Sequence, residues 1–265
     1  MVNPELSQGA TTPVAVLRAL HHGRAAGDPL ILPGPWDAAS ARVFEEAGFP
    51  ALATPSAGVA ASLGYEDGRT PADEMFAAVA RIVRSVSVPV SADIEAGYGL
   101  APKELVERLL ETGAVGCNLE DSGTGAVAAP TGSGGRGQQE RVLKDAQQQA
   151  EWLAEVRAAA GDRVVLNARI DAFLVQGVAD PVGEAIERAR LYVAAGADCV
   201  YPIGAPAEAL PRLRAGIEGP INVGAPPGGP TLKEWGELGA TRITFGPGLQ
   251  RRAAAALREI AATLA

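Results

Sequence analysis

The 265-residue chain has few of the residues on which several classes of site depend. It contains two histidines, His21 and His22, and two cysteines, Cys117 and Cys199. Adjacent histidines at the end of an expected N-terminal helix cannot assemble a His-rich zinc site or a Ser-His-Asp triad. The cysteines fall in expected strands, and we interpret them as small core residues in a reducing compartment rather than as a disulfide.

Basic and aromatic residues are also scarce. A net charge of −8 repels a phosphate backbone, and an aromatic content of 5% leaves few rings on which bases could stack. No apolar run approaches the roughly 18 residues that a membrane span needs, and the N-terminus lacks the hydrophobic core of an export signal. These absences predict a cytoplasmic protein that binds neither nucleic acid nor membrane.

The chain is rich, however, in short apolar segments that alternate with longer amphipathic ones. Almost continuous apolar runs are typical of strands that are covered on both faces. The expected strands are Leu30–Pro33, Ala51–Thr54, Val88–Asp93, Val115–Glu120, Val164–Ile170, Cys199–Ile203, Pro220–Val223 and Arg242–Phe245. The expected helices are Ala38–Ala47, Ala72–Ser85, Pro102–Thr112, Gln138–Ala160, Pro181–Ala195, Ala207–Ala215, Leu232–Leu238 and Leu249–Leu264. This α/β alternation predicts a (β/α)8 TIM barrel, with residues 1–265 as one domain.

An open doubly wound sheet that binds a dinucleotide is the alternative fold. It is disfavoured because no Gly-x-Gly-x-x-Gly follows the first expected strand, where Pro33-Gly34-Pro35 makes a different turn. In a barrel, the chemistry lies at the carboxyl ends of the strands. Polar residues gather at those ends: Trp36-Asp37, Thr54-Pro55-Ser56, Asp93-Ile94-Glu95, Glu120-Asp121, Arg169-Ile170-Asp171 and Asn222.

Acidic residues follow two successive expected strands. Asp93 and Glu95 are spaced i and i+2, so they point the same way if the strand continues, and Glu120 ends the next strand. Carboxylates that converge in this way favour a hard cation such as Mg²⁺. The alternative is that these acids only cap helices or pair with arginines.

Two of the loops that follow strands are longer than the others. Residues 56–70 end in Tyr65-Glu66-Asp67, and residues 122–137 are rich in glycine. Because the second loop leaves from the acidic strand end, we interpret residues 122–137 as a lid over the site. A tolerated surface insertion is the alternative.

Five segments of the chain resemble the isocitrate lyase/phosphoenolpyruvate mutase superfamily, and together they extend from residue 36 to about residue 245. They are Asp37–Arg42 with Glu46–Phe49, Ala61–Asp67, Asp93–Gly99, Asn118–Asp121 and Ala168–Ala172. The resemblance implies that Asp93 holds Mg²⁺ directly, with Glu95 and Glu120 reaching it through water. Mn²⁺ could replace Mg²⁺.

The resemblance also implies roles for other residues. Arg169 would grip a substrate carboxylate, and Asp67 would lie near the reacting centre. Tyr65 is a candidate proton donor, although packing within its loop is an equal alternative. Asp171 would orient Arg169. The expected substrate-binding residues are Trp36, Thr54, Ser56, Ala57, Asp93, Arg169 and Asn222.

The chain departs from the superfamily where each named reaction is customised. The lyases carry a Lys-x-Cys-Gly-His loop, and the mutases carry a lysine after Glu-Asp. This chain has Ser122-Gly123-Thr124-Gly125 at that place. Ile203 also stands where the lyases have a glutamate.

The expected function is therefore a Mg²⁺-dependent enzyme that acts on a small 2-oxo carboxylic acid through an enolate. A carbon–carbon lyase or decarboxylase with an oxaloacetate-like substrate is the first choice. The alternatives are an enzyme of phosphorus–carbon bonds, of the phosphoenolpyruvate mutase or phosphonopyruvate hydrolase type, and a non-catalytic barrel that binds a 2-oxo acid.

The apolar spacing in residues 249–264 predicts a C-terminal helix. Superfamily members exchange such a helix between subunits, which implies a homodimer or homotetramer. The alternative is a helix that packs on its own barrel.

Overall fold

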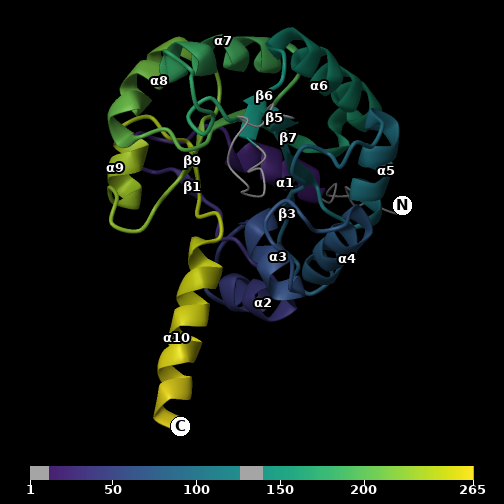
Figure 1. The fold of residues 1–265 in the computed structure, drawn as a ribbon, viewed down its shortest axis with the longest axis vertical. Coiled ribbons are helices and arrows are strands. Elements are labelled where there is room, and N and C mark those ends of the chain that lie inside the picture. The colour runs from purple at the N-terminus through teal and green to yellow at the C-terminus, as the bar shows by residue number, and fades with distance from the viewer. Residues whose placement is uncertain (1–11, 126–139, 265) are drawn as a thin grey trace, which may run out of the picture.

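The computed structural model describes residues 12–125 and 140–264. Within these ranges, parallel strands form the centre of the molecule and helices surround them (Figure 1). The helix α10 (Gly248–Leu264) extends away from this body at the C-terminus. The expected α/β class is confirmed.

The strands form one parallel sheet of five strands in the order β2-β3-β4-β7-β8 and one of three strands in the order β1-β10-β9. Their bounds are β1 Leu30–Ile31, β2 Leu52–Ala53, β3 Val90–Asp93, β4 Gly116–Glu120, β7 Val165–Ile170, β8 Cys199–Pro202, β9 Asn222–Gly224 and β10 Arg242–Thr244. A parallel bridge between Val200 and Ile221 links the two sheets on one side. On the other side, Ala53 N donates to Pro33 O over 3.1 Å. This arrangement is consistent with a TIM-like barrel.

Helices cover the outside of the strands, as Figure 1 shows. Their bounds are α1 Pro13–Leu20, α2 Ala38–Glu46, α3 Ser56–Leu63, α4 Ala72–Val83, α5 Pro102–Glu111, α6 Ala146–Ala160, α7 Pro181–Ala194, α8 Leu210–Gly216 and α9 Leu232–Glu237. Leu17 of α1 is fully buried in a small cluster with Leu30, Ala51 and Val165, which lie at or near the starts of their strands. Thus α1 covers the amino ends of the strands.

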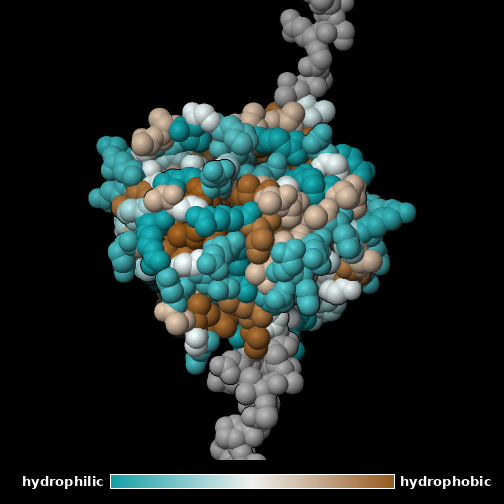
Figure 2. Space-filling view, turned by 90° about the horizontal axis from the view of Figure 1, so that it is seen from above, coloured by the Kyte–Doolittle hydropathy of each residue, from teal (hydrophilic) through white to brown (hydrophobic). Residues whose placement is uncertain are grey.

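Local sequence signals explain several of the helix boundaries. Asp37 and Ser40 form a reciprocal capping box at the start of α2, and Asp145 caps α6. Gly64, with φ +87°, ends α3 in the left-handed conformation that glycine adopts without strain. Figure 2, seen from the α7 side, shows a mostly hydrophilic face with smaller hydrophobic patches.

The structure corrects two local expectations. The expected loop 56–70 begins with a helix, α3, because Ser56–Leu63 is a run of mostly small and apolar residues without a proline, and the helix tolerates Gly58. The helix that was expected from residue 138 begins at Ala146. Before it, Glu140–Leu143 is a strand, β6, which pairs antiparallel with β5, Ser122–Gly125. The first residues of the predicted lid, 122–137, therefore belong to a hairpin arm, and residues 126–137 lie outside the described residues.

No helix in the described part of the chain combines the length and the apolar character that crossing a membrane requires.

Candidate active site

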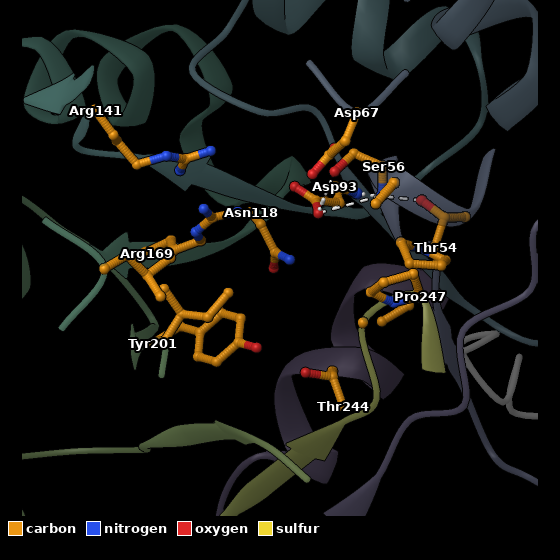
Figure 3. A pocket seen from close by; sticks show the side chains of 16 residues that line it. Thr54, Ser56, Asp67, Asp93, Asn118, Arg141, Arg169, Tyr201, Thr244 and Pro247 are labelled. Atoms are coloured by element: carbon orange, nitrogen blue, oxygen red, sulfur yellow. Dashed lines mark hydrogen bonds between the residues drawn. The ribbon is translucent and has the colours of Figure 1, made fainter. Parts of the chain in front are cut away.

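A cavity of about 180 Å³ lies at the carboxyl ends of the strands, where the fold places chemistry. Figure 3 shows its side chains, with acids on one side and arginines on the other. Its polar and charged lining residues are Thr54, Ser56, Asp67, Asp93, Asn118, Arg141, Arg169, Tyr201 and Thr244. Leu174, Ile203 and Pro247 supply apolar surface. Polar groups that converge in a cleft define a candidate ligand site.

Asp93, the last residue of β3, is held by the start of α3. Its Oδ2 accepts hydrogen bonds from Ser56 Oγ at 2.9 Å and from Ser56 N at 3.3 Å. Its own N–H donates to Thr54 Oγ1 at 3.2 Å. The N-terminus of a helix carries partial positive charge, so the start of α3 is a favourable neighbour for an acidic side chain. Asp93 is therefore fixed in place at the cavity wall before any ligand binds.

Glu95 lies immediately beyond Asp93, in a backbone conformation with φ +52° that is uncommon for a residue with a side chain. Its Oε1 is buried and accepts no hydrogen bond from a described residue. Burial and the nearby carboxylates of Asp93 and Asp67 raise the pKa of Glu95 to about 7. Carboxylates that lie this close repel one another when they are ionised, and a bound cation would relieve that repulsion.

Two arginines and two acids form a closed quartet on the opposite wall. Arg169 Nε donates to Asp171 Oδ1 at 2.7 Å, and Arg169 Nη1 donates to Glu120 Oε1. Arg141, from β6, donates through Nη1 to the same two acids, at 2.7 Å to Asp171 Oδ2 and 3.3 Å to Glu120 Oε2. Ser122 Oγ also donates to Asp171. Each buried carboxylate thus holds both guanidinium groups.

The quartet changes the acidity of its members in opposite directions. Burial would raise the pKa of Asp171, but the Arg169 guanidinium and the Ser122 hydroxyl outweigh it, so the pKa is lowered. For Glu120, burial dominates over Arg169, and the pKa is raised. Asp171 is therefore the firmly ionised partner that orients Arg169, in agreement with its expected role.

Asp121 supports the quartet from below. Its Oδ1 accepts the backbone N–H of Asp171 at 2.8 Å, and its Oδ2 accepts hydrogen bonds from Arg188 at 3.1 Å and Tyr192 at 2.8 Å. The side chain of Asp121 is fully buried. It fixes the backbone that carries Asp171.

The structure brings most of the predicted residues to one cavity. Those that line it are Thr54, Ser56, Ala57, Asp67, Asp93 and Arg169. Glu95 and Glu120 lie behind the lining, next to Asp93 and Arg169 respectively.

Three other predicted residues do not line the cavity. The Tyr65 hydroxyl donates to Glu74 at the surface, so the structure offers it no contact for proton donation. Trp36 packs edge-on against Phe44. Asn222 is fully buried, and its Nδ2 donates to Thr244 Oγ1 at 3.1 Å.

Four polar or charged lining residues were not predicted as site residues: Asn118, Arg141, Tyr201 and Thr244. Asn118 and Tyr201 stand inside expected strands, and Asn118 also begins one of the segments that carry the family resemblance, but neither residue was given a role at the site; Arg141 stands inside a segment that was expected to be helical. The signal for Asn118 was available, since it is a polar residue near the end of an otherwise apolar strand.

Among the described residues, no three acid, histidine or cysteine side chains are placed to ligate one metal ion directly. The donors nevertheless suit Mg²⁺, because Asp93 faces the cavity and the neighbouring Glu95 has an unpartnered, buried oxygen. A cation that retains several waters needs only one or two direct carboxylates.

The chain matches the family model described as phosphoenolpyruvate phosphomutase over residues 17–265. It therefore belongs to this family, within the isocitrate lyase/phosphoenolpyruvate mutase superfamily. An uncharacterized protein of Mycobacterium tuberculosis is 32% identical over 228 residues, 86% of this chain and 80% of that protein. The 2-methylisocitrate lyase of Aeropyrum pernix is 33% identical over 219 residues, 81% of this chain and 64% of that enzyme.

Solved structures show the same fold. A protein from Burkholderia cenocepacia J2315 is 35% identical and superposes with a TM-score of 0.81, covering 96% of this chain and 99% of the other. Oxaloacetate acetylhydrolase is 25% identical with a TM-score of 0.79, covering 94% of this chain and 84% of the other. The superfamily membership that the sequence motifs implied is confirmed.

Proposed function

We propose that the protein is a Mg²⁺-dependent enzyme that breaks a bond at C3 of a small 2-oxo carboxylic acid through an enolate. The opposition of Asp93 and Arg169 across one cavity is the observation that supports this most directly. An anionic substrate needs a cation on each side to be held in one orientation. Two superfamily relatives are named for carboxylic acids, 2-methylisocitrate lyase and oxaloacetate acetylhydrolase, and oxaloacetate is itself a 2-oxo acid.

Asp93 would be the direct ligand of the cation, with Glu95 and Glu120 holding its waters; Mn²⁺ is an alternative to Mg²⁺. When bound, the ion supplies Lewis-acid stabilisation of negative charge on the substrate oxygen. The chain's own part is to fix Asp93 through Ser56, so that the carboxylate needs no rearrangement when the ligand arrives.

Arg169 would bind the substrate carboxylate. Its Nε and Nη2 donate to Asp171 and its Nη1 donates to Glu120, which locks the guanidinium in one plane and leaves one N–H on each terminal nitrogen for the ligand. The N-terminus of α3, at Ser56 and Ala57, would add backbone N–H groups on the facing wall, beside Asp93.

Decarboxylation is the reaction that requires the fewest catalytic residues from the segment predicted as a lid. In oxaloacetate, the C3–C4 bond breaks, its electron pair forms the enolate across C2 and C3, and CO₂ leaves without a general base. One proton then adds to C3 to give pyruvate. Asp67 lines the cavity and is the candidate for proton transfer, whereas the Tyr65 hydroxyl is engaged with Glu74 at the surface. Cleavage of a larger 2-hydroxy or 2-oxo dicarboxylate passes through the same kind of enolate.

The apolar part of the lining favours carbon over phosphorus chemistry. Ile203 and Leu174 stand at the cavity, and Ser122 is engaged with Asp171 where a mutase would place a lysine. Phosphorus–carbon cleavage remains the second candidate, because the matched family is described as phosphoenolpyruvate phosphomutase. A binding barrel without turnover is the third.

One assay panel separates these candidates. Purified protein is given oxaloacetate, related C4–C6 acids and phosphonopyruvate, each with Mg²⁺ and with excess chelator. Mg²⁺-dependent pyruvate or cleavage product from a carbon acid supports the proposal, and phosphate from phosphonopyruvate supports the second candidate. Ligand-induced thermal stabilisation without turnover supports the third. No turnover of any carbon acid by folded protein would overturn the proposal.

We further propose that the 265 residues act as one domain, a closed (β/α)8 barrel, and that copies of this chain associate as a dimer or tetramer. Leu257, Ile260 and Leu264 of α10 are 55–83% exposed. Apolar residues at helical spacing on an extended helix are typical of a surface that a second copy covers, by exchange of the helix or by side-to-side packing.

A further inference from the structure

The interior of the barrel below the cavity contains a charged side chain that the proposed function does not use. Arg242, on β10, is completely buried. No carboxylate among the described residues lies within ion-pair distance of it, and its Nε has no hydrogen-bond partner there. Burial lowers the pKa of this guanidinium, but an arginine remains charged. A buried charge without a counter-ion is costly, so its neighbours indicate what it does.

The neighbours of Arg242 are neutral side chains that can accept hydrogen bonds. Nη1 lies 3.3 Å from His21 Nε2, and Nη2 lies 3.5 Å from Ser91 Oγ and 3.4 Å from Asn118 Oδ1. His21 Nδ1 lies 2.7 Å from the carbonyl of Leu17, so Nδ1 carries the proton and Nε2 is the acceptor. Burial and the Arg242 charge lower the pKa of His21 to about 4, which keeps this ring neutral near pH 7.

Asn118 connects this interior to the cavity. It is in register with Asp93 on β3 and with Asn167 on β7, and it lines the cavity. Its Oδ1 accepts Asn167 Nδ2 at 2.8 Å as well as Arg242 Nη2. Its Nδ2 donates to no described residue. Figure 3 shows the Asn118 side chain between Asp93 and Arg169.

The charge of Arg242 sets the direction of the Asn118 amide. Two asparagines that face one another can hydrogen-bond in either sense, because each amide both donates and accepts. A guanidinium only donates, so the Asn118 atom that faces Arg242 must be oxygen. With Oδ1 turned down toward Arg242 and Asn167, the NH₂ group of Asn118 faces the cavity.

We propose that Asn118 is a ligand-binding residue whose NH₂ group donates to an oxygen of the 2-oxo acid beside Asp93, and that Arg242 is the positioning residue that fixes this orientation. The inference rests on the proposed function for the identity of the ligand. A donor at this point stabilises the oxygen on which negative charge develops in an enolate. Each donor in this chain therefore has a defined direction. His21 donates to the Leu17 carbonyl, and Arg242 donates both to His21 and to Asn118.

The test is a double-mutant cycle on ligand binding. Oxalate, a planar chelating dianion, is titrated calorimetrically into the full-length protein with saturating Mg²⁺. The proteins are the wild type, Asn118→Ala, Arg242→Met and the double variant. We expect Asn118→Ala to weaken oxalate roughly tenfold or more, the loss that removing a hydrogen bond to a charged group produces. Arg242→Met should weaken it roughly two- to tenfold, a coupling typical of residues in contact.

The decisive comparison is the double variant. If Arg242 acts through the amide, Arg242→Met has no further effect in the Asn118→Ala background. Equal losses in both backgrounds would mean that the Arg242 charge acts on the ligand directly, which overturns the positioning role. Arg242→Lys, which also only donates, should retain most of the affinity. Arg242→Gln, which can donate or accept, replaces Arg242→Met if the latter does not fold.

Failure of the proposed function would look different. If wild-type protein does not bind oxalate with Mg²⁺, the proposed function falls, and this assignment falls with it. If wild-type protein binds oxalate and Asn118→Ala binds it equally well, only the assignment of Asn118 is overturned.

Discussion

The rim of the cavity and the barrel interior beneath it solve the problem of buried charge in different ways. At the rim, Arg169 and Arg141 share two carboxylates, so that each guanidinium is neutralised by direct ion pairs. In the interior, the acceptors of Arg242 among residues 12–125 and 140–264 are all neutral. The rim therefore holds its charges in fixed positions for a ligand, whereas the interior uses one charge to impose a direction on hydrogen bonds.

The two regions should also differ in how much stability is lost when a charged side chain is removed. An ion-pair quartet loses much when one member is removed, because a partner remains buried without compensation. An unpaired buried charge costs free energy while it is present, so its loss is tolerated better. Matched substitutions at the rim and in the interior should therefore change the free energy of unfolding by different amounts.

The largest effect on folding is expected at the rim. Arg169→Gln leaves Asp171 and Glu120 with Arg141 alone, and we expect the free energy of unfolding to fall by about 3 kcal/mol. Arg242→Gln should cost clearly less. Urea unfolding of both variants measures this. Arg212→Gln, which breaks an exposed pair with Asp180, is the control and should change stability by less than about 1 kcal/mol. A larger loss for Arg242→Gln than for Arg169→Gln would contradict the comparison.

The next effect concerns ligand binding rather than folding. Asp93→Ala removes the expected direct ligand of the cation, and we expect Mg²⁺-dependent oxalate affinity to fall by more than about a hundredfold, beyond the loss typical of an outer ligand. Asp73→Ala is the matched control, because Asp73 is an exposed acid on α4 that does not line the cavity. Retention of Mg²⁺-dependent binding in Asp93→Ala would remove Asp93 from the metal site.

In the interior, the buried His21 should make the stability of the protein depend on pH. The pKa of His21 is lowered to about 4 in the folded protein, against 6.5 for a free histidine. Between these values the unfolded chain binds a proton that the folded chain does not, so His21 makes the protein less stable as pH falls from about 6.5 to 4. The contribution reaches about 3 kcal/mol at the lower end.

The measurement compares urea unfolding of wild type and His21→Gln across that range. Because the pKa of Glu95 is raised to about 7, its contribution has the opposite sign, and only the difference between the two proteins isolates His21. His22→Gln, at the exposed neighbouring histidine, should follow the wild type. Parallel curves for wild type and His21→Gln would show that His21 is not held neutral.

The smallest expected effect lies outside both regions. Leu257→Glu with Ile260→Glu places charge on the exposed apolar side of α10. We expect the proposed oligomer to dissociate, as measured by light scattering, while oxalate binding changes little because neither residue lines the cavity. An unchanged mass would remove α10 from the subunit interface.

The sequence predicted the rim better than the interior, for a physical reason. Asp93 and Arg169 lie at strand ends, where one rule of barrel architecture gathers polar residues at one site. The hydrogen bonds of Arg242 on β10 reach the residue that follows α1 and residues on β3 and β4, and no local pattern indicates which strand residues point inward at the same height.

The errors in the elements have a similar origin. Residues 140–143 became a strand because Ser122–Gly125 pairs with them, a contact between two segments that periodicity within either one does not show. This pairing places Arg141 at the cavity, which is why Arg141 was not predicted as a site residue. The α3 helix, in contrast, was recognisable from its small and apolar composition, and the loop assignment there was an error of interpretation.

The most direct test of the account is a crystal structure of the protein soaked with Mn²⁺ and oxalate, with Mn²⁺ located by its anomalous scattering. The account predicts one ion bound directly by Asp93, with oxalate chelating it and facing Arg169 across the cavity. Density for the ion or for oxalate at any other place, with none at Asp93, would contradict it.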